Sequence, residues 1–209
     1  KNLSKMNRID PKNQLLVATH NKGKAKEFKK LFLPFKIKTI FSGDIGIKEP
    51  KETGKTFKEN SVLKAKSGLS YGLNVLADDS GLSVDSLGGR PGIYSARWAK
   101  KYGSWKEAMK QIYQKILKSN TNNFSAKYCC CLTIAWKNGE INSYYGEVSG
   151  EICWPPRGLN GFGYDPIFVP DSKNMTFGEM KKKEKMRIDH RYSAFRKIIK
   201  NHILKTGQL

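Results

Sequence analysis

Two adjacent carboxylates and a hydroxyl follow an apolar run in the first half of the chain, at Asp78, Asp79 and Ser80. The apolar residues before them are typical of a buried strand, so acidic oxygens come to its end. Carboxylates in such a place can hold a metal ion or take a proton from water. The alternative is structural: with Gly81, the same residues would form an Asx-type turn before a second strand at residues 82–85. These residues alone leave both interpretations open.

A second polar cluster joins an expected strand, residues 15–19, to an expected helix, residues 25–33. A loop of this kind can offer backbone N–H groups, a helix N-terminus and ammonium groups to a phosphate chain. It lacks the spacing of a Walker loop, and a solvated turn is the alternative. The cluster consists of Thr19, His20, Asn21, Lys22, Gly23 and Lys24.

Two more polar clusters lie in the second half of the chain. Residues 158–166 combine glycines with aromatic residues, so the backbone could approach a ligand and a ring could stack on a base, although an ordinary turn is the alternative. Lys185, His190 and Arg191 follow a lysine-rich run. Near a cleft they would supply donors to phosphate oxygens or a carbonyl; otherwise they would be a solvated face and the start of the last helix.

Strands and helices that alternate along the chain must position these clusters. An Asn-Gly pair at residues 138–139 predicts a long hairpin, and capping boxes at Thr56 and Thr176 predict helix starts. Asn60 falls in the first turns of one helix, where it could lie on the surface or reach into a cleft. The expected strands are residues 37–41, 124–136 and 141–152, and the expected helices are residues 57–71, 105–117 and 191–204.

Length and composition predict one domain, residues 1–209, in which residues 1–13 form a flexible N-terminal extension. Apolar runs are too short for a membrane span, and the first residues lack a signal peptide's apolar stretch, so we expect a cytoplasmic protein without a membrane partner. Four cysteines without a CxxC pair, three of them consecutive at residues 129–131, are expected to be core residues and not zinc ligands.

The net charge of +21 comes from 39 Lys and Arg against 18 Asp and Glu. The lysines are spread over nearly the whole length and do not form one stripe with interleaved aromatic residues. This distribution argues against a dedicated nucleic-acid partner. The excess can still attract a small polyanionic substrate.

Six ordered motifs together resemble the inosine triphosphate pyrophosphatase family, over roughly residues 15–203. The resemblance implies an elongated α/β fold with two lobes, a central mixed β-sheet flanked by helices and a cleft between the lobes, and usually a homodimer. It also implies Mg²⁺-dependent hydrolysis of ITP, dITP and XTP to the monophosphate and pyrophosphate. The motifs are THNKGK at residues 19–24, ETGKTFKEN at 52–60, ADDSGLSVDSLGGRPGIYSAR at 77–97, GFGYDPIF at 161–168, TFGEM at 176–180 and EK followed by HR at 184–191.

The resemblance also implies roles for particular residues. Asp79 would be the proton acceptor and a magnesium ligand, while residues 19–24 would hold the triphosphate. Donors near the base would favour the six-keto group of hypoxanthine or xanthine over the amino group of adenine. The residues expected around substrate, base and sugar are Ser80, Phe162, Gly163, Tyr164, Asp165, Lys185, His190 and Arg191.

Three positions depart from the family pattern. Lys51 stands where an acidic residue that helps to bind the metal often precedes the ETG motif. If the metal needs a second protein carboxylate, Glu52 or Glu49 must supply it, and Glu52 is taken as the metal ligand beside Asp79. Asp189 replaces the usual serine, which bears on base preference, and His20 replaces the commoner glycine. The alternative functions are a related pyrophosphatase for modified pyrimidine nucleotides, as in the septum-formation-inhibitor family, and a basic nucleotide- or RNA-binding protein without catalysis.

Overall fold

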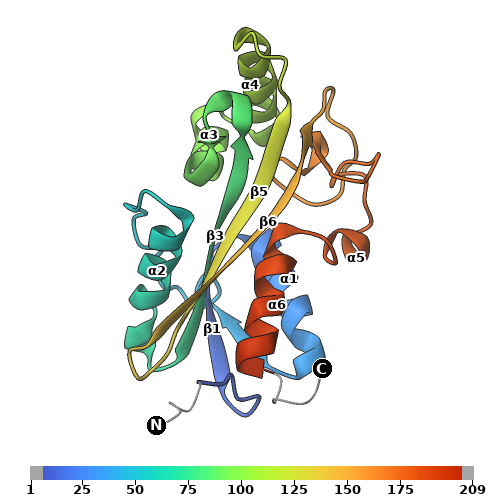
Figure 1. Ribbon diagram of the computed structural model, residues 1–209. Helices are drawn as coiled ribbons and strands as arrows, with labels where there is room; N and C mark the ends of the chain where they lie inside the picture. Colours follow the sequence, from blue (N-terminus) through green and yellow to red (C-terminus); the bar gives the residue numbers. More distant parts are fainter. Residues whose placement is uncertain (1–6, 204–209) are drawn as a thin grey trace, which may run out of the picture. The chain divides into compact units, whose positions relative to one another are not determined.

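The computed structural model describes residues 7–203 and divides into two compact units (Figure 1). Within the described residues, unit 1 comprises residues 7–79, 131–145 and 192–203, and unit 2 comprises residues 80–130 and 146–191. Three long strands contribute residues to both units: β3 (Asn74–Val84), β5 (Ser125–Ala135) and β6 (Ile141–Ile152).

The strands form one mixed sheet, which confirms the predicted fold class. Its order is β2-β1-β3-β5-β6-β7, with β4 (Arg90–Pro91) paired to β3 off this path. β1 (Gln14–Ala18) lies parallel to both β2 (Lys38–Phe41) and β3, whereas β4 is antiparallel to β3 and β7 (Phe168–Pro170) is antiparallel to β6.

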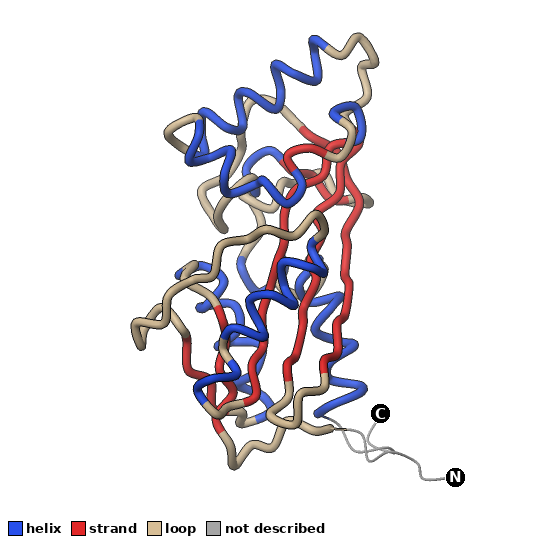
Figure 2. Tube along the Cα trace, turned by 90° about the vertical axis from the view of Figure 1, so that its left-hand side faces the viewer, coloured by secondary structure: helices blue, strands red, loops and turns tan. Residues whose placement is uncertain are grey.

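In unit 1, helices cover both faces of the strands. α2 (Phe57–Ser67) lies on one face, and α1 (Lys22–Phe32) and α6 (His190–Ile198) lie on the other (Figures 1 and 2). Phe32 of α1 meets Phe195 of α6 edge to face, with ring centroids 4.9 Å apart. Shorter helical segments complete the unit: η1 (Leu33–Phe35), η2 (Leu69–Tyr71) and the π-helical η6 (Ile199–Ile203).

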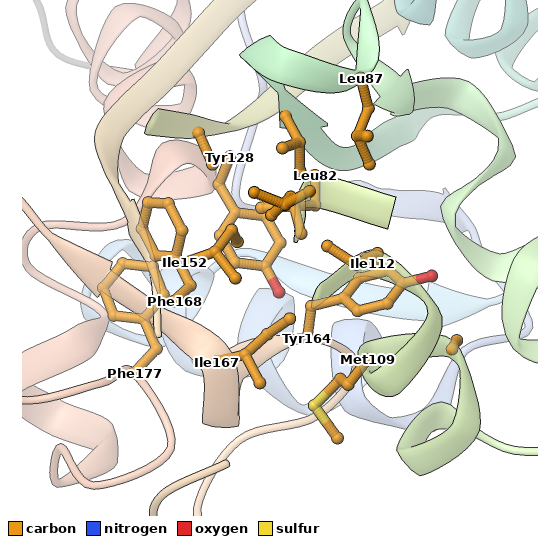
Figure 3. Packing of buried hydrophobic residues seen from close by; sticks show 14 of the residues in the cluster. Leu82, Leu87, Met109, Ile112, Tyr128, Ile152, Tyr164, Ile167, Phe168 and Phe177 are labelled. Atoms are coloured by element: carbon orange, nitrogen blue, oxygen red, sulfur yellow. The ribbon is translucent and has the colours of Figure 1, made fainter. Parts of the chain in front are cut away.

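Unit 2 has its own apolar core, shown in Figure 3, where Tyr128, Tyr164 and Phe168 lie among aliphatic side chains. α4 (Trp105–Lys118) presents its apolar stripe to this core, as its 3.6-residue spacing predicts. The other helical segments of the unit are η3 (Asp85–Leu87), η4 (Gly92–Tyr94), α3 (Ser95–Lys101), η5 (Asp165–Ile167) and α5 (Lys182–Lys185).

The turn considered as an alternative at Asp78-Asp79-Ser80 is wrong, because β3 is continuous from Asn74 to Val84. Gly81 serves close packing instead of a turn. A Cβ built on it would lie 2.2 Å from the carbonyl oxygen of Gly92 and 2.5 Å from Ser95 Oγ. Asp78 and Asp79 therefore lie within the strand, with residues of β3 both before and after them.

The helix predicted to start at Thr176 is also wrong, although the capping hydrogen bonds form. Thr176 Oγ1 accepts from the Glu179 backbone N–H at 3.1 Å, and Glu179 Oε2 accepts from the Thr176 backbone N–H at 2.8 Å. The next two amides are used elsewhere: Phe177 N–H donates to Phe168 O and Gly178 N–H to Asp165 O. The chain becomes helical only in α5.

The predicted hairpin is confirmed, and it closes at Gly139, whose φ is +90°. Cys129, Cys130 and Cys131 are buried free thiols, as expected of core residues, while Cys153 is partly exposed.

Near the N-terminus, the Ile9 backbone N–H donates to His202 O at 2.9 Å. In the part of the chain that the structure describes, no helix combines the length and apolar character that a membrane crossing requires.

Candidate functional site

The loop between β1 and α1 ends in a helix N-cap. Asn21 has extended backbone angles, and its Oδ1 accepts from the Lys24 backbone N–H at 3.0 Å. Thr19 is buried, and its Oγ1 accepts from the Asn21 backbone N–H at 3.2 Å. His20 Nε2 donates to Ile47 O at 2.6 Å, so this hydrogen bond holds the loop against the segment that follows β2. A helix N-terminus with lysines beside it is a site for anions.

Lys24, in the first turn of α1, forms an ion pair with the buried carboxylate of Asp78. The contact joins Nζ to Oδ1. An ammonium has three donors, so this pair leaves Lys24 able to contact a second acceptor. The pairing places the basic loop directly beside the acidic segment of β3.

Asp79 faces α2 and is contacted there by two side chains. Asn60 Nδ2 donates to Asp79 Oδ2 at 3.1 Å, and Lys64 Nζ lies 3.3 Å from Asp79 Oδ1. Lys64 Nζ also lies 2.8 Å from Glu52 Oε1, so two carboxylates share one ammonium. Asp79, Asn60 and Lys64 are each buried.

Burial sets the protonation behaviour of this group. It raises the pKa of Asp79 above the ordinary value; the charges of Lys64 and Lys24 oppose the rise, and the charge of Glu52 adds to it. For Lys64, burial lowers the pKa, but the attraction of Asp79 and Glu52 outweighs it and the pKa is raised. Asp79 is thus a carboxylate with a basicity above that of a solvated one, as a proton acceptor requires.

Sequence reasoning missed Lys64 and left Asn60 undecided. Asn60 is fully buried, and its Oδ1 accepts from the Gly54 backbone N–H at 2.8 Å while its amide nitrogen reaches Asp79. The two residues are four positions apart on α2 and therefore share one face. An amide and a lysine at this spacing, on the helix face that is buried, are the sequence signal that could have identified both residues as part of the site.

The donor set around Asp79 suits a hard divalent cation. Mg²⁺ binds through one or two carboxylates together with substrate phosphates and waters. Asp79 and Glu52 supply such carboxylates around one position, which the Lys64 ammonium reaches. Among residues 7–203, no three His, Cys, Asp or Glu side chains are grouped for metal binding.

In unit 2, Lys185 and Asp165 form a buried ion pair, with Lys185 Nζ 2.7 Å from Asp165 Oδ2. The same carboxylate oxygen accepts from the Phe162 backbone N–H at 2.8 Å. Lys185 Nζ also lies 5.0 Å from the centroid of the Phe162 ring. The glycine-rich loop and α5 are therefore joined by one charged contact.

His190 and Arg191 lie at the start of α6, and both are buried. The ring of His190 stacks on Tyr128, with centroids 4.7 Å apart and planes inclined by 10°. Arg191 donates to Ser80 Oγ at 3.1 Å. A guanidinium and an imidazole held this way can present donors to a planar base or a phosphate.

Two expected ligand-binding residues have no side chain that could contact a ligand. Tyr164 is 1% exposed, packs in the core of unit 2 and donates from its hydroxyl to Ser95 O at 2.9 Å. Gly163 has no side chain, and its φ is +68°. For these two, only the backbone is available for recognition.

The expected site residues thus fall into two groups, each brought together within one unit. Lys22 and Gly23 open α1 as its first two residues and belong to the first group. In unit 1 the group is Thr19, His20, Asn21, Lys22, Gly23, Lys24, Glu52 and Asp79, and in unit 2 it is Ser80, Phe162, Gly163, Tyr164, Asp165, Lys185, His190 and Arg191. Of the departures, Lys51 is exposed and Asp189 is buried.

Comparison with known proteins agrees with the motifs. The model of the Ham1 family matches residues 15–201. A dITP/XTP pyrophosphatase of Zymomonas mobilis is 39% identical over 197 residues, which cover 93% of this chain and 94% of that protein. One of Caulobacter vibrioides is 42% identical over 186 residues, 88% of this chain and 95% of that protein. The structure of a HAM1 protein from Coxiella burnetii aligns with a TM-score of 0.82 at 33% identity, covering 89% and 96% of the two chains.

Proposed function

The chain belongs to the Ham1 family, and on that premise we propose that it hydrolyses the non-standard purine nucleoside triphosphates dITP, XTP and ITP to the monophosphate and pyrophosphate. The observation that carries the chemical step is the buried Asp79 carboxylate. It contacts Lys64 and Asn60, and its pKa is raised. The enzyme is a nucleoside triphosphate pyrophosphatase that clears such nucleotides from the pool.

In the proposed reaction, the α-phosphorus is attacked by a water molecule. Asp79 takes a proton from the water as the new P–O bond forms, and the bond between the α-phosphorus and the bridging oxygen breaks. Pyrophosphate leaves with the electrons of that bond. Asn60 holds Asp79 Oδ2, so the other carboxylate oxygen is directed toward Lys64 and the reacting groups.

The phosphate chain is assigned to the loop at residues 19–24. The N-terminus of α1 and the ammonium groups of Lys22 and Lys24 favour negative charge there. Lys24 already contacts Asp78 beside the reacting carboxylate. Binding of the triphosphate at this loop would place its α-phosphate toward β3.

Mg²⁺ is the cofactor proposed for the site, held by Asp79 and Glu52 together with the substrate phosphates. When bound, it neutralises phosphate charge and polarises the phosphorus–oxygen bonds. Glu52 and Asp79 are the residues that would hold it, and Lys64 keeps both in place. Glu52 fills the role left open by Lys51.

Base recognition is assigned to the group in unit 2. Lys185, His190 and Arg191 are donors, and a six-keto purine offers an acceptor where adenine offers an amino group. A site built to donate rejects adenine because its buried donors would stay unpaired. Asp189, which is buried and precedes His190, replaces the serine that the family usually has at this position.

A pyrophosphate-release assay with ITP, dITP, XTP, ATP, GTP and dTTP tests the function. We expect the three non-standard purine nucleotides to be hydrolysed at least tenfold faster than the others, and Asp79→Asn to reduce kcat by about 10²–10⁴-fold. Asp44→Asn, an exposed carboxylate of the same unit, is the control and should retain full activity. Preference for dTTP, or full activity in Asp79→Asn, would contradict the proposal.

Isotope labelling locates the bond that breaks. In H₂¹⁸O, attack at the α-phosphorus puts the label in the monophosphate, and attack at the β-phosphorus puts it in pyrophosphate. Mass spectrometry of both products decides between them.

The homodimer also remains a prediction. Light scattering of the eluted protein measures the oligomeric state directly.

A further inference from the structure

A pocket of about 260 Å³ opens on unit 2, and its lining includes none of the residues assigned to the reaction. Its lining residues come from four elements: η3, β4, the middle of α3 and the C-terminal end of α4. Three of its lining side chains are cations, Arg90, Lys115 and Lys118, and the lining residues include no carboxylate. Such a grouping of positive charge in a concave place attracts anions.

The geometry of the pocket favours oxyanions in particular. Arg90 Nε donates to Leu87 O at 3.0 Å, which holds the guanidinium in place and uses one of its five N–H groups. Lys115 Nζ lies 6.0 Å from the centroid of the Trp98 ring, which forms an aromatic wall. A fixed guanidinium beside two ammonium groups matches the tetrahedral oxygens of phosphoryl groups.

A hydroxyl in this pocket points to a missing partner. Ser86 Oγ is buried and has no hydrogen-bond partner among the described residues, although Ser86 lines the pocket. A buried hydroxyl without a partner costs free energy, so such groups are usually satisfied. A bound oxyanion would accept its hydrogen bond.

Helix electrostatics account for only part of this arrangement. Lys115 and Lys118 lie in the last turn of α4, where cations stabilise the helix C-terminus. Arg90 comes from β4 and Ser86 from η3, and neither has a role at that helix end. The pKa of Lys127 is raised chiefly by its hydrogen bond and charge contact with Glu147, and the charge of Asp85, next to Ser86, adds to the rise.

We propose that Arg90, Lys115, Lys118 and Ser86 form a second binding site, distinct from the site of hydrolysis, for a compact phosphate-type oxyanion. The volume lies below the range of about 300–1,000 Å³ typical of drug-sized ligands, so one or two phosphoryl groups fit better than a whole nucleotide. Free pyrophosphate and the phosphate tail of a nucleotide share this chemistry. Such an anion is a product, or a part of the substrate, of the proposed function, and this identification of the ligand rests on that function.

The test is a titration of the full chain with inorganic pyrophosphate in a metal-free buffer, followed through the indole N–H signal of Trp98 in ¹H–¹⁵N spectra. Trp98→Phe assigns that signal among the four tryptophans. We expect a saturable shift in the wild-type protein and at least a tenfold higher dissociation constant in the double variant Lys115→Glu with Lys118→Glu. The rate of hydrolysis at saturating substrate should be the same in both.

The matched control is Lys106→Glu with Lys110→Glu, which makes the same charge change at exposed positions of α4 outside the pocket. It should keep the wild-type dissociation constant. An equal loss in both double variants would show a general charge effect and overturn the proposal, as would an unchanged response in the Lys115–Lys118 variant. A parallel titration with ADP identifies the source: tighter binding of ADP assigns the site to a nucleotide tail, and tighter binding of pyrophosphate to the free anion, and either result supports it.

Discussion

Lys64 and Asp79 form a buried ion pair, in which Nζ lies 3.3 Å from Oδ1. Asp79 comes from β3 and Lys64 from α2, and the same ammonium holds Glu52 at 2.8 Å. Lys64 thus controls two carboxylates at once. Its removal should change both the basicity of Asp79 and the way a cation is held.

Lys64→Met should move the acid limb of the kcat/KM profile to higher pH. Burial raises the pKa of Asp79 and Lys64 opposes that rise, so without Lys64 the pKa rises further. Asp79 must be deprotonated to act, so activity is lost as pH falls through its pKa, and a higher pKa moves that loss upward. We expect a displacement of about one pH unit or more.

Lys66→Met is the control for this measurement, because Lys66 is exposed on the same helix. Its pH profile should coincide with that of the wild-type protein. A Lys64→Met profile with an unmoved acid limb would remove Asp79 from the role of proton acceptor.

Glu52→Gln should raise the Mg²⁺ concentration needed for half-maximal activity by about tenfold or more, because the amide lacks the charge that attracts the cation. Activity at saturating Mg²⁺ should be largely retained, since Asp79 is intact. Glu49→Gln, at the other carboxylate considered for this role, should leave the requirement unchanged. If the two variants behave in the opposite way, Glu49 and not Glu52 holds the metal.

Lys185→Met should destabilise the protein by about 3–5 kcal/mol, because it leaves the buried Asp165 carboxylate without its cation. Asp165→Asn in the same chain removes the uncompensated charge, so the double variant should be more stable than Lys185→Met alone. Urea denaturation of the wild type, both single variants and the double variant measures the coupling. Strict additivity of the two changes would show that the pair contributes nothing.

Gly81→Ala should destabilise the protein by about 1–3 kcal/mol or more, since the new methyl group would meet the Gly92 carbonyl at 2.2 Å. Gly72→Ala is the comparison: nothing lies within 4 Å of its Cβ, but its φ of +71° strains an alanine by about 1–2 kcal/mol. Thermal unfolding should therefore rank Gly81→Ala as the more harmful change. The reverse ranking would mean that β3 moves easily away from η4.

Elements governed by local pattern were predictable from the sequence. β1 and the β5–β6 hairpin follow from apolar runs and an Asn-Gly turn, and the N-cap of α2 follows from Thr56. Thr176 misled for a physical reason: its capping bonds are local, but the following amides are taken by carbonyls brought close only by the fold.

The candidate site was predictable where motifs carry it and not where long-range contacts do. Asp79 stands out as a carboxylate beside an apolar run. The importance of Lys64 depends on its lying against a strand fifteen residues further along the chain. The same holds for Tyr128, which becomes relevant only because the fold stacks it on His190.

Neighbouring residues of a strand point to opposite faces, and the two acids of β3 meet their lysines from opposite sides, Asp78 from α1 and Asp79 from α2 (Figure 1). A slip of β3 by one position would turn both carboxylates to the opposite faces of the sheet. One acid would then take the place of the other, and the second acid and one lysine would lose their partners. Asp78 and Asp79 therefore help to specify the register of β3, because a chain with the wrong register would be less stable even without a bound nucleotide.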